Sequence, residues 1–90
     1  MSEVYIPLDY VGIGKAVGSG KPHSKIDPYV FGPLAGTIID LNTLKQNYAA
    51  AVRAQPGFGK RGGVAGKADV AAANIRINWL VKRGVFVKIP

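Results

Sequence analysis

A glycine-rich stretch from residue 56 to 67 holds the side chains best suited to contact a negatively charged partner. Phe58, Lys60 and Arg61 stand there among five glycines. Basic side chains on a flexible glycine backbone can follow a phosphate strand, while an aromatic ring stacks on a base. The stretch contains a single Arg-Gly-Gly unit, however, and it lacks the basic-Gly-aromatic signature of sheet-type RNA-binding domains. A loop that is solvated or covered by a protein partner is therefore the alternative interpretation.

Other glycine patterns do not predict a nucleotide site. Gly14-Lys15 and Gly20-Lys21 lack both the leading glycine and the following Ser or Thr of a P-loop. Gly57-x-Gly59-x-x-Gly62 matches the dinucleotide-binding pattern, but a predicted helix rather than a strand precedes it. A chain of 90 residues is also too short for the two mononucleotide-binding halves of that fold.

The sequence offers no catalytic constellation. His23 is the only histidine, it lies in a Gly/Pro-rich segment, and there is no cysteine to pair with it. The five acidic residues are scattered, without the spacing of metal ligands or of paired carboxylates. We therefore expect no enzymatic activity, no cofactor, no metal site and no small-molecule substrate.

The positive charge lies almost wholly in the second half of the chain. Four lysines balance four acids over residues 1–45, whereas residues 46–90 carry eight cations against Asp69 alone, which gives the net charge of +7. Such asymmetry predicts an acidic partner for the second half, either a nucleic acid or an acidic protein surface. The predicted contact residues are its eight cations: Arg53, Lys60, Arg61, Lys67, Arg76, Lys82, Arg83 and Lys88.

The segment from residue 1 to 40 predicts an extended, apolar arm. Residues 4–13 alternate loosely, and Pro7 limits them to an edge strand or an extended segment. Residues 14–28 have the composition of a linker, and residues 29–31 form a short apolar anchor before Gly32-Pro33 breaks the chain. Large apolar side chains in such segments suit insertion into a partner. Over the whole chain, the predicted anchors are Tyr5, Tyr10, Tyr29, Phe31, Phe58 and Trp79.

A helix is predicted from about residue 42 to 54. Asp40, Asn42 or Thr43 can cap it, and Thr43-x-x-Gln46 fits a capping box. Pro56-Gly57 ends it. One apolar face follows at helical spacing, formed by Leu41, Leu44, Tyr48, Ala51 and Val52.

Residues 69–83 fit two patterns. Asp69 can cap a helix that ends at Gly84, with an apolar stripe formed by Val70, Ala73, Ile77, Leu80 and Val81. Strand periodicity is also present, in the alternation of Ile75, Ile77, Trp79 and Val81. The alanines at 71–73 and both end signals favour the helix, and residues 85–89 then predict a terminal strand.

The run from residue 78 to 87 resembles part of a winged-helix domain, because a basic helix end turns through Gly84 into a strand. The resemblance covers only this short run of the chain. A winged-helix domain also needs a three-helix core upstream, which we do not expect from residues 1–40 with their many helix breakers.

These patterns together predict a small α+β fold, with the extended arm over residues 1–40 and a basic module of helices and short strands over residues 41–90. Gly and Pro make up 18 of the 90 residues, while 48% of the chain is hydrophobic. That combination suits either an extended chain that covers a partner or a small domain with long loops. The expected core consists of Leu41, Leu44, Tyr48, Val52, Ile77, Trp79, Leu80 and Val81, with Phe86 and Val87 beside them.

We expect a structural component of a larger assembly, such as a minor capsid or cement-type protein of a virion. Its partners would be other protein subunits, and its basic half would face DNA or RNA or an acidic neighbour. The alternative is an autonomous nucleic-acid-binding protein that uses residues 57–67 and the C-terminal element. An assembly component would become ordered only in the particle, whereas an autonomous binder would melt cooperatively alone.

The sequence predicts no membrane span, because no stretch approaches the roughly 20 apolar residues of a membrane helix. The N-terminus lacks the basic leader and apolar segment of a signal peptide, so we expect intracellular synthesis without export.

Overall fold

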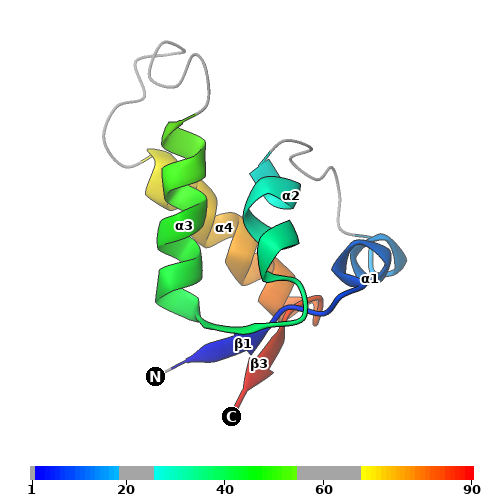
Figure 1. The fold of residues 1–90 in the computed structure, drawn as a ribbon. Coiled ribbons are helices and arrows are strands. Elements are labelled where there is room, and N and C mark those ends of the chain that lie inside the picture. Colours follow the sequence, from blue (N-terminus) through cyan, green and yellow to red (C-terminus); the bar gives the residue numbers. More distant parts are fainter. Residues whose placement is uncertain (1, 19–25, 55–67) are drawn as a thin grey trace.

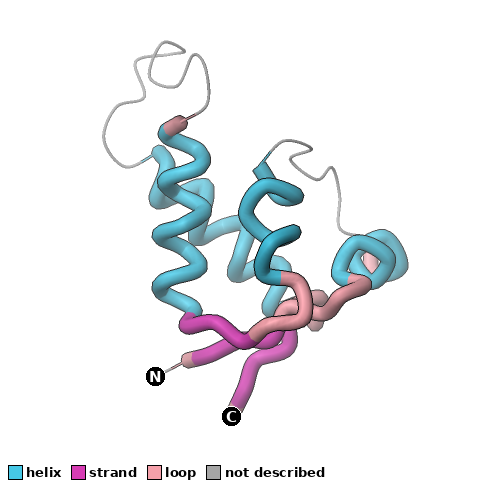
Figure 2. Tube along the Cα trace, in the orientation of Figure 1, coloured by secondary structure: helices cyan, strands magenta, loops and turns pink. Residues whose placement is uncertain are grey.

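The fold is a small α+β arrangement in which helices cover one side of a short sheet (Figures 1 and 2). The computed structural model describes residues 2–18, 26–54 and 68–90. Within these residues the α+β class is confirmed. The elements in chain order are β1 (Glu3–Tyr5), α1 (Tyr10–Ala16), α2 (Ile26–Phe31), the 3₁₀ helix η1 (Gly32–Leu34), β2 (Ile38–Asp40), α3 (Leu41–Arg53), α4 (Ala68–Lys82) and β3 (Val87–Ile89).

The sheet is antiparallel, with β1 between β2 and β3. Val4 is the centre of the register, opposite Ile39 on one side and Lys88 on the other. The prediction of an edge strand or extended segment over residues 4–13 is therefore wrong. Pro7 does not interrupt the central strand because β1 ends two residues before it, at Tyr5.

Long extended Gly/Pro-rich segments are not confirmed in the segment from residue 1 to 40. Tyr10–Ala16 is helical, although it contains two glycines. Ile26–Phe31 is also helical and includes the expected apolar anchor. Pro28 is tolerated there because the third residue of a helix has no intrahelical partner for its amide. The rest of the expected linker, residues 19–25, lies outside the described residues.

Helix α3 confirms the helix predicted over residues 42–54, displaced by one residue. Its cap is Asp40, whose side chain accepts a hydrogen bond of 3.1 Å from the amide of Thr43. The capping box proposed between Thr43 and Gln46 is wrong, because Thr43 already lies inside the first turn.

Helix α4 confirms the helical interpretation of residues 69–83 over the strand alternative. It ends in a Schellman motif, in which the amide of Gly84 donates to Val81 and the amide of Val85 donates to Leu80. Gly84 adopts a φ of 81°, as this motif requires. The chain then enters β3, which lies within the terminal strand predicted over residues 85–89. Here β3 pairs with β1, from the other end of the sequence.

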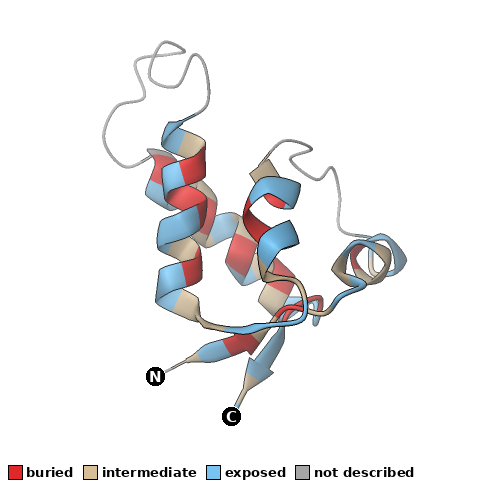
Figure 3. Cartoon of the chain, in the orientation of Figure 1, coloured by how far each residue is buried: buried red, intermediate tan, exposed pale blue. Residues whose placement is uncertain are grey.

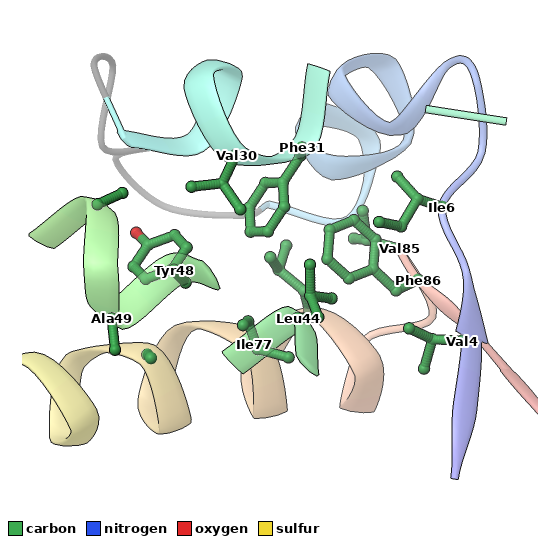
Figure 4. Packing of buried hydrophobic residues seen from close by; sticks show 13 residues of the cluster. Val4, Ile6, Val30, Phe31, Leu44, Tyr48, Ala49, Ile77, Val85 and Phe86 are labelled. Carbon is green, nitrogen blue, oxygen red and sulfur yellow. The ribbon is translucent and has the colours of Figure 1, made fainter. Parts of the chain in front are cut away.

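The buried side chains come from both halves of the sequence (Figures 3 and 4). Five residues of the expected core are buried: Leu44, Tyr48, Ile77, Leu80 and Phe86. Four others are partly buried against it: Leu41, Val52, Trp79 and Val81. Val87 was expected in the core but is 48% exposed. The core also contains Ala51 and Ala73, which lie on the predicted apolar faces of the two helices. Its remaining members were not predicted there: Val4, Ile6, Val30, Phe31, Ala49 and Val85.

Residues 1–40 supply two short helices upstream of α4, α1 and α2, and Phe31 of α2 reaches the core. None of the described helices is long and apolar enough to cross a membrane.

Candidate functional site

Three of the eight predicted contact cations are exposed in one part of the chain, from the last turn of α4 to β3. They are Lys82, Arg83 and Lys88. Neither Lys82 nor Arg83 forms an ion pair with an acid of the described residues. Both lie where the helix dipole is negative, which stabilises cations. The Schellman hydrogen bonds already satisfy the carbonyls of Leu80 and Val81, so these cations are not required as caps.

Arg53 and Arg76, by contrast, form ion pairs within the chain. Arg53 lies 2.5 Å from Asp69 across the facing ends of α3 and α4, and its side chain is 55% exposed. Arg76 lies 2.6 Å from Asp27, and its side chain is only 13% exposed. The remaining predicted cations, Lys60, Arg61 and Lys67, lie outside the described residues.

Trp79 of α4 lies between Arg76, on the same helix, and Arg83, the first residue after it. The Arg76 guanidinium carbon is 5.8 Å from the centre of the indole, and that of Arg83 is 5.2 Å away. The indole itself is partly buried and packs against the core. Cation–π attraction at these distances holds the arginines against the ring. We call Arg76, Trp79 and Arg83 the cation–indole cluster.

A buried network fixes one end of this cluster. Arg76 donates two hydrogen bonds to Oδ2 of Asp27, from Nε at 3.0 Å and from Nη2 at 2.6 Å. The hydroxyl of Tyr48 donates to Oδ1 of the same carboxylate at 2.9 Å. Asp27 is only 4% exposed, so its charge depends on these partners from α3 and α4. Burial, followed by the hydrogen bond to Asp27, raises the pKa of the Tyr48 hydroxyl above its ordinary value of 10.0.

No local sequence pattern signals this network, because Asp27 is 21 positions from Tyr48 and 49 positions from Arg76. The sequence predicts Tyr48 only as a core residue and Arg76 only as a contact for an external partner. The pKa of the Tyr10 hydroxyl is also raised above 10.0, first by burial and then by the negative charge of Asp27.

A hollow of about 310 Å³ lies between α3 and the N-terminal half of α4. Val70 and Ala73 line it from α4, and Ala49 lines it from α3. Lys45, Gln46 and Arg53 supply its polar rim.

The predicted partner anchors occupy different environments. Phe31 is 1% exposed and stacks with Tyr48 in the chain's own core, and Tyr10 packs edge-on against Phe31. Tyr29 is 75% exposed on α2. Tyr5 is half-buried on the sheet, and Phe58 lies outside the described residues.

The side of the sheet opposite Val4 presents an apolar row that the sequence did not predict. Tyr5 pairs with Ile38 of β2 and with Val87 of β3 in the antiparallel register, so the three side chains share one face. Ile38 is 56% exposed and Val87 is 48% exposed.

In the part of the chain that the structure describes, no three His, Cys, Asp or Glu residues lie close enough together to hold a metal ion. Comparison with models of known protein families, with curated proteins and with solved structures finds no match.

Proposed function

We propose that this chain is a non-enzymatic nucleic-acid-binding protein whose contact surface is the C-terminal end of α4 together with β3. The observation that carries the proposal is the group of exposed cations there, Lys82, Arg83 and Lys88, with Arg83 held against a half-buried tryptophan. A cation whose side chain is already held in place, as Arg83 is by the indole, can contact a phosphate at a lower entropy cost.

The distribution of acids supports a binding role over a catalytic one. Asp27 and Asp69 are both engaged with arginines, and Asp40 caps α3. Each of these carboxylates has a structural partner, and none of them faces another acid as a general acid–base pair would.

The core supports an autonomous protein over a chain that becomes ordered only on a partner. Residues from β1, α2, α3, α4 and the turn before β3 form one buried cluster. The basic second half is therefore held in place by apolar contacts that the chain makes with itself.

Salt-dependent binding tests this proposal. We expect the chain to bind a DNA duplex at about 50 mM salt, with an affinity that falls steeply toward about 200 mM because bound cations are released from the phosphates. The K82A/R83A variant should lower the salt slope by about 2. The control K15A/K45A removes the same charge from α1 and α3 and should leave the slope within experimental error. Absence of binding at low salt, or equal effects of the two variants, would overturn the proposal.

A second candidate function is a structural subunit of a larger assembly, such as a minor capsid or cement-type protein of a virion. The apolar row of Tyr5, Ile38 and Val87 favours it, as does the position of β2 and β3 at the two edges of the described sheet. Exposed edges and apolar faces are places where another subunit can add a strand or pack.

Size-exclusion chromatography of the untagged protein from its native source separates the two candidates. A subunit should elute within a particle, and the V87K variant should release it. Elution of the wild-type chain as a monomer would contradict the assembly role.

A further inference from the structure

We infer that the Trp79 indole supports cations and does not stack on bases, so that the ligand of this surface is the phosphate backbone of a nucleic-acid duplex. This inference rests on the proposed function and names its substrate class. Three features of the cation–indole cluster support it. Arginines already cover the Trp79 ring, Asp27 holds Arg76 in place, and Arg83 is exposed without a carboxylate partner among the described residues.

The ring of Trp79 is already occupied. Arg76 stands one helical turn before it and Arg83 one turn after it, at 5.8 and 5.2 Å from the ring centre. The indole also packs against the core. A stacking base needs an open π-face, as on the aromatic platforms of single-strand binders. A guanidinium group would have to leave before a base could stack on the face of the ring that it covers.

Moving the Arg76 guanidinium away from the Trp79 ring is energetically unfavourable. Both of its hydrogen bonds to Asp27 end on a carboxylate that is 4% exposed. Moving the guanidinium toward a ligand would leave that buried charge with only the Tyr48 hydroxyl. Removing one partner from a buried ion pair is strongly unfavourable. Asp27 therefore holds the Arg76 guanidinium in place beside the Trp79 ring.

The side chain of Arg83 is exposed and is also held in place by the indole. It has no carboxylate partner among the described residues, and the indole limits the directions that its side chain takes. A guanidinium can lie on an aromatic ring and still direct N–H groups toward phosphate oxygens. Lys82, next to it, adds a second exposed cation.

The resulting surface matches a duplex better than a single strand. Duplex phosphates are fixed in space and are recognised largely by Arg and Lys side chains, without contact to the stacked bases. Single-strand binding without stacking forgoes the favourable contact of each base with an aromatic ring. We therefore expect affinity for duplex DNA without preference for its sequence.

Fluorescence can test this directly, because Trp79 is the only tryptophan of the chain. The probes are a DNA duplex, a single strand of equal length, and the same single strand with its bases removed. We expect the duplex to bind most tightly, the two single strands to bind within about twofold of each other, and neither to quench Trp79 strongly. Stronger binding of the base-bearing strand by tenfold or more, with strong quenching, would overturn the inference and leave nucleic-acid binding itself intact.

Variants give a readout that mere loss of fold would not produce. Arg83→Ala should weaken duplex binding more at 50 mM salt than at 200 mM salt, by a factor of about three, as expected for the loss of one phosphate contact. Lys15→Ala, the control, should show no such difference between the two salt concentrations. With labelled strands, Trp79→Phe should weaken base-bearing and abasic strands by the same factor. Selective loss of the base-bearing strand would show stacking and contradict the inference. If none of the probes binds, the proposed function fails together with it.

Discussion

At the scale of single residues, Asp27 does most to determine the fold and the candidate site together. Its carboxylate lies in α2, is almost fully buried, and accepts hydrogen bonds from α3 and α4. A buried charge is tolerated only where its partners satisfy it. The position of Arg76 beside Trp79 is thus tied to the packing of three helices.

Removal of the Tyr48 hydroxyl should weaken this network measurably. Tyr48→Phe keeps the ring that stacks on Phe31 but deprives Oδ1 of Asp27 of its donor. We expect the free energy of unfolding to fall by about 2 kcal/mol, as for other hydrogen bonds to charged groups. Urea denaturation measures this loss. Tyr29→Phe, at a position that is 75% exposed, is the matched control and should leave stability unchanged. Equal stabilities of the two variants would contradict the role of the network.

Asp69 should make stability depend on pH in the acid range. The hydrogen bond from Arg53 lowers the pKa of Asp69 below its ordinary value of 3.8. The folded state therefore prefers the ionised carboxylate. The resulting stabilisation is present above the unfolded pKa and is lost as the pH falls through the lowered folded pKa.

Denaturation curves of the wild type and Asp69→Asn at several pH values test this expectation. The difference in unfolding free energy between them should be largest near neutral pH and should shrink below about pH 4. A difference that stays constant from pH 7 to pH 2.5 would show that ionisation of Asp69 does not contribute.

At the scale of elements, the helix ends determine where the chain turns toward the sheet. Asp40 ends β2 and caps α3, and the Schellman motif at Gly84 ends α4 and directs the chain toward β3. Both are short-range devices, in which a few neighbouring residues satisfy the free amides or carbonyls of a helix end.

Gly84→Ala should destabilise the fold by about 1–2 kcal/mol, because an L-residue is strained at positive φ. The backbone φ of Gly84 is 81°, and a methyl group there would meet no atom within 4 Å, so the conformation alone causes the loss. Gly32→Ala is a close control, since that site is equally open and has no positive φ. Thermal denaturation should show a lower Tm for the first variant only. The same Tm shift in both would attribute the effect to the added methyl group.

The difference between local signals and tertiary contacts explains which elements the sequence predicts. Helix α3 follows from apolar periodicity. Since its periodicity also fits a strand, helix α4 follows from the alanines at 71–73 and the stop signal at Gly84. Helices α1 and α2 do not, because they are seven and six residues long and contain glycines or a proline. Such short helices are held by tertiary contacts such as those of Phe31, which no local pattern encodes.

The candidate site likewise has some features that local sequence predicts and others that depend on tertiary packing. The exposure of Lys82 and Arg83 follows from their place at a basic helix end. The pairing of Arg76 with Asp27 does not, since it depends on how α2 packs against α4. The apolar row on the sheet likewise depends on the register of three strands that come from distant parts of the sequence.

At the scale of the whole molecule, the two ends of the chain meet in the sheet. Strand β1 lies between β2 and β3, and both termini are found at the same end of the fold (Figure 1). Val4 and Ile6 are fully buried, as are Val85 and Phe86 near the other end of the chain. The N-terminal segment is thus part of the core, and its loss should affect the basic half of the chain.

Ile6→Ala should therefore destabilise the entire isolated chain. Truncation of a fully buried isoleucine leaves a cavity and costs about 2–5 kcal/mol. Because the core is shared, far-UV circular dichroism and Trp79 fluorescence should report the same shifted urea midpoint. Ile75→Ala, on the exposed side of α4 at 72% exposure, should change stability by no more than about 0.5 kcal/mol. If Ile6→Ala left the Trp79 transition in place, residues 1–40 would behave as an arm that separates from α3 and α4. Coincident transitions would instead show that the surface around Trp79 is supported by the complete fold, as an autonomous binding protein requires.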